Sequence, residues 1–169
     1  SNRSIGLMPR LTFAEKKNIQ QVIQWNLTRT DLIDHNPFTA DLTDVTSDIA
    51  MMNYLISFAP ISFNVNTGIS YIGMRNSIAT RDNFVVMLGF NKSLFKNKLN
   101  VGVNGSGGLS IVNDIRGNVF NASCSVLLKA YKKHGVKFYL HFQNNKYPEN
   151  SQQRSYQEFK TNVSYVYSI

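Results

Sequence analysis

Hydrophobic and polar residues alternate one by one along most of this chain. In ISFNVNTGISY (61–71), the odd positions hold isoleucine, phenylalanine, valine, threonine and tyrosine, and the even positions hold serine, asparagine and glycine. VKFYLHFQ (136–143) repeats the alternation with its apolar residues at even positions. A period of two places successive side chains on opposite faces of a β-strand. The chain is therefore predicted to be all-β, with one apolar and one polar face.

The same alternation predicts nine strands, most of them 10–15 residues long. Strands of globular proteins most often have about 5–6 residues, whereas a strand that crosses a bilayer needs about 9–11. Strand length therefore favours a membrane protein. The predicted ranges are 4–13, 18–33, 48–58, 61–74, 83–95, 98–112, 118–132, 135–146 and 156–169.

The predicted connections alternate between short and long. Short turns at one end and long loops at the other are typical of up-and-down transmembrane barrels. We therefore predict a single domain over 1–169, an antiparallel up-and-down transmembrane β-barrel with about 8–10 strands in this chain. The short connections are 15–18, 59–60, 95–98 and 132–135, and the longer ones are 34–47, 75–82, 113–117 and 144–155.

Composition shows how few charges the polar face carries. Charged residues make up 17% of the chain, against about 25% in typical soluble domains, and Asn, Ser and Thr take their place. A soluble outer face would carry abundant Lys and Glu, so the polar face is predicted to line a lumen while the apolar face meets lipid. The polar residues predicted to face the lumen are Asn64, Asn66, Asn100, Asn104, Asn121, Lys129 and His141.

The formal net charge of +8 is concentrated at one end of the predicted strands. Lysines surround the short turns with Glu15 as the single acid there, whereas acids slightly outnumber basic residues at the opposite end. A nucleic-acid-binding face would instead line basic residues and interleaved aromatics along one groove. Nucleic acid is therefore not an expected partner.

The last strand carries the most specific motif. In VSYVYSI, Val163, Tyr165, Tyr167 and Ile169 share one parity. This segment resembles the C-terminal strand of Gram-negative outer-membrane β-barrel proteins, and the hairpins look like the barrel portions of Bacteroidetes-type members. Ile169 departs from that family's usual terminal Phe or Trp. The resemblance implies an outer-membrane location, a periplasmic C-terminus and recognition of these residues by the barrel-assembly machinery.

Nine strands conflict with the even number that bacterial single-chain barrels usually have. Either the count is wrong by one, or the chain is the C-terminal part of a larger barrel. The start at Ser1, with no visible signal peptide, favours the second interpretation.

The longest predicted external loop is acidic and is the candidate surface for contacting a partner. Its carboxylates could hold a divalent ion, but their spacing lacks the D-x-D-x-D-G pattern of a calcium loop. A solvated loop is the simpler interpretation, and no metal site or cofactor is predicted. The candidate contact residues are Asp34, His35, Phe38, Asp41 and Asp44.

For catalysis, the sequence offers only His141 on the polar face, with Ser123, Ser125 and Ser164 as hydroxyls that could neighbour it across strands. Nothing in the sequence completes a triad, so no catalytic residue is assigned. The lone Cys124 falls on the apolar face, where it is expected to behave as a small hydrophobe.

We therefore predict an outer-membrane protein that acts as a pore or as a membrane-embedded subunit of a surface transport or assembly complex. Expected partners are the lipid bilayer, lipopolysaccharide and other outer-membrane or surface subunits. One alternative is a soluble barrel of the lipocalin or fatty-acid-binding type, with its apolar face around a lipid. A second alternative is an outer-membrane lipid-modifying enzyme. The transported solute and the oligomeric state do not follow from the sequence.

Overall fold

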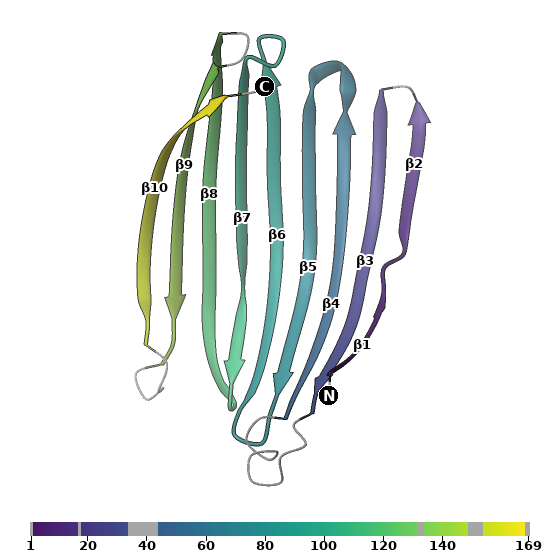
Figure 1. Ribbon diagram of the computed structural model, residues 1–169, viewed down its shortest axis with the longest axis vertical. Coiled ribbons are helices and arrows are strands. Elements are labelled where there is room, and N and C mark those ends of the chain that lie inside the picture. The colour runs from purple at the N-terminus through teal and green to yellow at the C-terminus, as the bar shows by residue number, and fades with distance from the viewer. Residues whose placement is uncertain (1, 17, 34–43, 132–133, 149–153, 168–169) are drawn as a thin grey trace.

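The computed structural model describes residues 2–16, 18–33, 44–131, 134–148 and 154–167, which form one antiparallel sheet (Figure 1). In these ranges one 3-10 turn, η1 (Ala59–Ile61), lies between two strands. The strands are β1 (Asn2–Leu7), β2 (Arg10–Lys16), β3 (Ile19–Leu32), β4 (Val45–Phe58), β5 (Phe63–Arg75), β6 (Thr80–Leu94), β7 (Leu99–Val112), β8 (Ile115–Tyr131), β9 (His134–Lys146) and β10 (Tyr156–Tyr167).

Strand order in the sheet follows chain order, which confirms the predicted antiparallel up-and-down fold. The one variation is that β1 and β2 both pair with β3, in one register from Asn2 to Phe13 that includes Leu7 opposite Leu27 and Arg10 opposite Gln24, before it shifts between Phe13 and Lys16. Between them, the Pro9 carbonyl still accepts a hydrogen bond from the Trp25 amide at 3.0 Å. Proline has no N–H to return, so the first predicted strand, 4–13, appears as two.

The remaining eight strands lie within a few residues of their predicted ranges, but the prediction of a long loop at 113–117 was wrong. Asn113 and Asp114 form a two-residue turn there, with φ values of 47° and 65°. Positive φ at both central positions gives the twist that matches neighbouring antiparallel strands. The connection between β5 and β6 is also shorter than predicted, because the strands extend to Arg75 and Thr80. Loop length therefore distinguishes the two ends less sharply than expected.

The sheet is a single layer without a hydrophobic core. Val22, at 7% exposure, is the one buried apolar side chain within the described part of the chain. The chain exposes 12124 Å², whereas a compact monomer of this mass exposes about 8,400 Å². Burial within the chain therefore cannot be the main source of stability for this sheet.

Register defines two faces with different chemistry, because directly opposed residues point to the same side. We call the polar face the side that carries the row Asn66–Gly89–Asn104–Ser123–His141. We call the apolar face the side that carries the neighbouring row Val65–Phe90–Val103–Cys124–Leu140.

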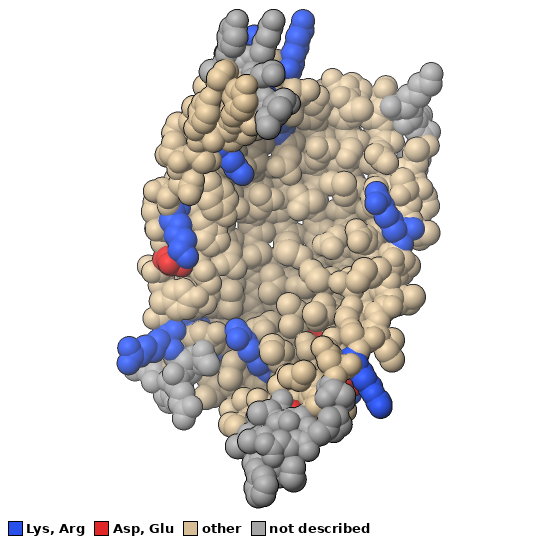
Figure 2. All heavy atoms as spheres, viewed as in Figure 1, with Lys and Arg blue, Asp and Glu red and all other residues tan. Residues whose placement is uncertain are grey.

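The polar face is the concave one. A Cβ added at Gly89 would collide with the side-chain amides of Asn66 and Asn104, because polar side chains converge over the glycine. Figure 2 shows a hollowed face whose middle carries no Lys, Arg, Asp or Glu. With the exception of Gly73, the buried residues of the described strands belong to this face: Val22, Gly68, Gly89, Gly102, Ser110, Gly117, Gly135 and Asn145.

The predicted barrel is not closed within the described residues. Strands β1 and β2 form one edge of the sheet and β10 forms the other, and these edges are not paired with each other. The molecule therefore has the form of a curved section of barrel wall (Figure 1).

Adjacent glycines on opposite faces of β7 provide a test of this packing. A Cβ at Gly108 would overlap the Phe84 carbonyl oxygen, whereas one at Gly107 would meet only ordinary contacts, the nearest being Phe120 at 3.8 Å. We expect Gly108→Ala to lower the free energy of unfolding by about 1–3 kcal/mol. Urea unfolding of detergent-folded protein, followed by the fluorescence of the single tryptophan, measures this change.

Gly107→Ala is the matched control. It should leave stability unchanged or raise it by about 0.4–1 kcal/mol, because alanine restricts the unfolded chain. Equal losses for both variants would contradict the assignment of the crowded side to the polar face.

Candidate functional site

The polar face collects every residue predicted to face a lumen. Asn66, Asn104 and His141 lie in one row across β5, β7 and β9. The other four occupy rows on the same side: Asn64 opposite Asn91, Asn100 opposite Ser93, Asn121 opposite Ser106, and Lys129 opposite Gly135. The structure therefore brings these dispersed residues onto one concave surface.

Polar groups on this face are only partly satisfied by one another. Ser93 Oγ donates to Asn100 Oδ1 at 2.6 Å, and Asn121 Nδ2 donates to Ser106 Oγ at 3.3 Å. In contrast, Ser110 Oγ, His141 Nδ1 and Asn145 Oδ1 are enclosed and have no hydrogen-bond partner among the described residues. Enclosed polar atoms are costly unless water or another group pairs with them, so this surface is suited to contact with water.

The structure does not assemble a nucleophile and base around His141. Ser123 is its direct register partner on β8, but no hydrogen bond joins the two side chains in the described structure. The His141 ring instead stacks on Tyr139, with centroids 6.2 Å apart. Ser125 lies opposite Tyr139, and Ser164 lies opposite Lys137, so both serines are in other rows.

The acidic loop contributes no described site. Asp34, His35, Phe38 and Asp41 lie outside the described residues, and Asp44 directly precedes β4. Within the described ranges, no group of three or more His, Cys, Asp or Glu side chains is placed to hold a metal ion.

The apolar face carries a band bordered by aromatic residues. Near the 59–62 and 95–98 turns, Phe63 stacks with Phe58 and Phe90 at centroid distances of 6.2 and 6.3 Å. Toward the other end, Tyr71 meets Phe84 at 4.8 Å. Eight residue steps separate Phe63 from Tyr71 along β5, which is about 26 Å at about 3.3 Å per residue.

Between these aromatic groups the apolar face is aliphatic and hollowed. A hollow of about 580 Å³ crosses β3 to β7, and it is lined by uncharged residues. Its floor is low because Ala50 and Gly107 have small side chains, while Ile69, Val86 and Leu109 form its higher parts. This surface offers contact to hydrocarbon and little to water.

The terminal motif lies on the apolar face of the edge strand β10. Val163, Tyr165 and Tyr167 are opposite Phe138, Val136 and His134 of β9. The His134 ring contacts both tyrosines, and its Nδ1 forms a hydrogen bond with the Tyr165 hydroxyl. Ile169 lies outside the described residues.

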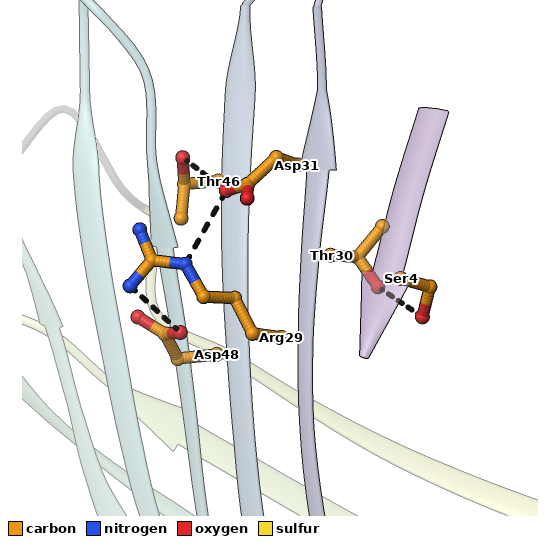
Figure 3. Close-up of polar contacts among 6 residues, drawn as sticks. All are labelled: Ser4, Arg29, Thr30, Asp31, Thr46 and Asp48. Atoms are coloured by element: carbon orange, nitrogen blue, oxygen red, sulfur yellow. Dashed lines mark hydrogen bonds and ion pairs between the residues drawn. The ribbon is translucent and has the colours of Figure 1, made fainter. Parts of the chain in front are cut away.

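Polar contacts begin directly beyond the apolar band. Figure 3 shows Arg29 of β3 directed toward Asp31 and toward Asp48 of β4, at 3.4 and 3.9 Å. Thr46 Oγ1 donates to Asp31 at 3.1 Å, and the Tyr71 hydroxyl donates to Asp82 at 2.7 Å. Sequence analysis placed these charges at one end of the sheet but missed their contacts, because the register between two strands cannot be read from either strand alone.

Comparisons of the chain with protein-family models, curated proteins and solved structures gave no match. Across the described ranges, no helix is long and apolar enough to cross a membrane. The evidence for a function therefore comes from the chemistry of the two faces of the sheet.

The rim of the band gives a second prediction. We expect Tyr71→Phe to lower the free energy of unfolding by about 1 kcal/mol, because it leaves the Asp82 carboxylate without its hydroxyl donor. Arg29→Gln should cost at most about 0.5 kcal/mol, because exposed ion pairs contribute little and the Arg29 side chain is 62% exposed. Urea midpoints of both variants check this order, and a larger loss for Arg29→Gln would contradict it.

Proposed function

We propose that this sheet is a membrane-spanning wall of an outer-membrane β-barrel and lines a water-filled passage for polar solutes. The observation that carries the proposal is a single-layer sheet with its apolar band on the convex face, whose described residues bury almost no apolar side chain. A large exposed apolar surface needs an apolar environment. Lipid on the outside of a barrel supplies it.

The dimensions of the band support a bilayer as that environment. Outer-membrane barrels have an apolar band about 25 Å tall with aromatic girdles at both borders. About 26 Å of strand separates Phe63 from Tyr71, which spans about 19–22 Å of height at the usual strand tilt of about 35–45°, and aromatic pairs lie at both ends. The ion pairs of Arg29 lie beyond one border, where head groups and water would begin.

The chemistry of the polar face supports an aqueous passage. Its central rows combine asparagine, serine and glycine with apolar residues such as Met87 and Val85, and its charged residues lie toward the margins. Because the described strands place no ring of one charge sign across the middle, we expect weak selectivity between cations and anions. The outer-membrane location and the assembly signal at Val163, Tyr165 and Tyr167 are part of this proposal through the family resemblance.

The curvature favours this proposal over a soluble lipid-carrying barrel. Such a carrier encloses its ligand with the apolar face and presents the polar face to solvent. In this sheet all buried residues of the described strands except Gly73 belong to the polar face instead. Closing the sheet along its existing curvature would leave the apolar side chains outside.

Fractionation with fluorescence quenching tests the proposal. Trp25 is the single tryptophan and belongs to the apolar face, opposite Met52. We expect the protein in the outer-membrane fraction, and after reconstitution we expect strong quenching of Trp25 by lipids brominated on their acyl chains. Lipids brominated at the head group serve as the control. Protein in the soluble fraction without detergent would refute membrane insertion and favour the lipid carrier.

Neighbouring residues of β7 give a matched prediction for the two faces. Val103→Arg places a charge in the apolar band, two residues inside the border row of Phe63 and Val101, and should destabilise the reconstituted protein by about 1–2 kcal/mol, between the costs at the bilayer midplane and at the interface. Asn104→Arg, on the polar face, should change stability by at most about 0.5 kcal/mol. Unfolding in lipid vesicles measures both values.

Conductance measurements in planar bilayers then test whether the polar face lines an open passage. Asn104→Arg should shift the reversal potential of planar-bilayer currents toward anion preference, because the new charge would lie in the passage. Val103→Arg, assayed in whatever fraction inserts, should leave selectivity unchanged. The same selectivity for the wild type and Asn104→Arg would contradict a lumen position for Asn104.

A further inference from the structure

The two edges of the sheet offer backbone groups for further pairing. Within the described residues, β1 and β2 are paired on one side only, with β3, and β10 is paired on one side only, with β9. If the sheet lies in a bilayer, as proposed above, unpaired N–H and C=O groups cannot face hydrocarbon. Both edges therefore need a strand beside them.

The two edges run in the same direction. Eight successive pairings, β1/β2–β3 and then β3–β4 through β9–β10, are all antiparallel. An even number of reversals returns the original direction, so β10 is parallel to β1 and β2. The arrows of β2 and β10 in Figure 1 point the same way.

This direction limits what can cover the edges. Joining β10 to β1 and β2 of the same sheet would create a parallel seam, and a ring of copies in one orientation would repeat that seam at every junction. Bacterial single-chain barrels are antiparallel throughout, with an even number of strands. We infer that an odd number of strands from outside the described residues joins the two edges, antiparallel to β10 on one side and to β1 and β2 on the other.

The exposed side chains of the edge strands indicate what the joining strands should carry on each face. On the apolar face, Ile5 of β1 is 80% exposed and Val163 of β10 is 66% exposed, against 43% for Leu140 on the neighbouring β9. The joining strands should therefore be apolar on that side. On the other side, Asn162 and Ser164 of β10 call for polar neighbours that continue the passage.

The proline of the first edge does not block this pairing. Its carbonyl accepts from the Trp25 amide, so Pro9 belongs to the set of residues whose backbone groups point toward β3. The alternate residues, including Ser4, Gly6 and Thr12, point their amides outward. None of the outward positions from 2 to 12 is a proline, so a complete row of donors faces the missing strand.

Disulfide scanning in native outer membranes tests the inference. In a Cys124→Ser background, Leu11→Cys on β2 is combined in turn with Phe159→Cys, Thr161→Cys and Val163→Cys on β10. Two cysteines can form a disulfide when their Cα atoms lie about 4.4–6.8 Å apart, a distance that adjacent strands provide. Two strands with one other strand between them lie about 10 Å apart, which is too far. The register partners Leu11→Cys and Ile23→Cys form the positive control.

We expect the control disulfide and none between β2 and β10, either within a chain or between two copies. Amide hydrogen exchange measures whether the edge is paired. The outward amides of Ser4, Gly6 and Thr12 should be protected as strongly as the amides of Ile5 and Leu11, which point toward β3. A β2–β10 disulfide, or fast exchange confined to the outward amides, would overturn the inference. Both outcomes concern protein already in the membrane, so they are distinct from the failure of membrane insertion.

Discussion

Backbone hydrogen bonds between neighbouring strands hold this molecule together, because almost no apolar side chain is buried within it. The ladders β3–β4 and β6–β7 each join fourteen residues to fourteen without a break. Such ladders pair the backbone N–H and C=O groups of the interior strands. The outward backbone groups of the two edge strands need partners from outside the described sheet. The open edges and the large exposed surface of the sheet both follow from this dependence on the backbone.

Small residues on the polar face produce the curvature of the sheet. Where Gly89 and Gly102 replace larger residues, the side chains of Asn66, Asn91 and Asn104 fold over the backbone of the next strand. The polar side can therefore contract while the bulky residues of the apolar side spread apart. A sheet that bends in this direction encloses polar groups and turns its apolar surface outward. This arrangement is favourable in a bilayer.

The proposed contacts with membrane and with lumen use opposite faces of the sheet. The apolar face offers aromatic borders, an aliphatic middle and ion pairs beyond it. The polar face offers enclosed oxygens and nitrogens, such as Ser110 Oγ, without partners among the described residues. A lipid carrier would need the opposite curvature, and an enzyme built on His141 would need a hydrogen-bonded nucleophile that Ser123 does not provide in the described structure. A passage uses both faces as they are.

The sequence by itself determined the all-β class, the strand ranges and the division into two faces, because a period of two is a local property of each strand. It therefore placed Asn66, Asn104 and His141 on the same side before any register was known. It misjudged the connection at Asn113 and Asp114, since turn type depends on φ values that residue polarity does not reveal. Only the tertiary structure decided which face is concave, how Arg29 meets Asp48, and that the two edges are parallel and unjoined. These features depend on register and on contacts between distant segments, which no single strand contains.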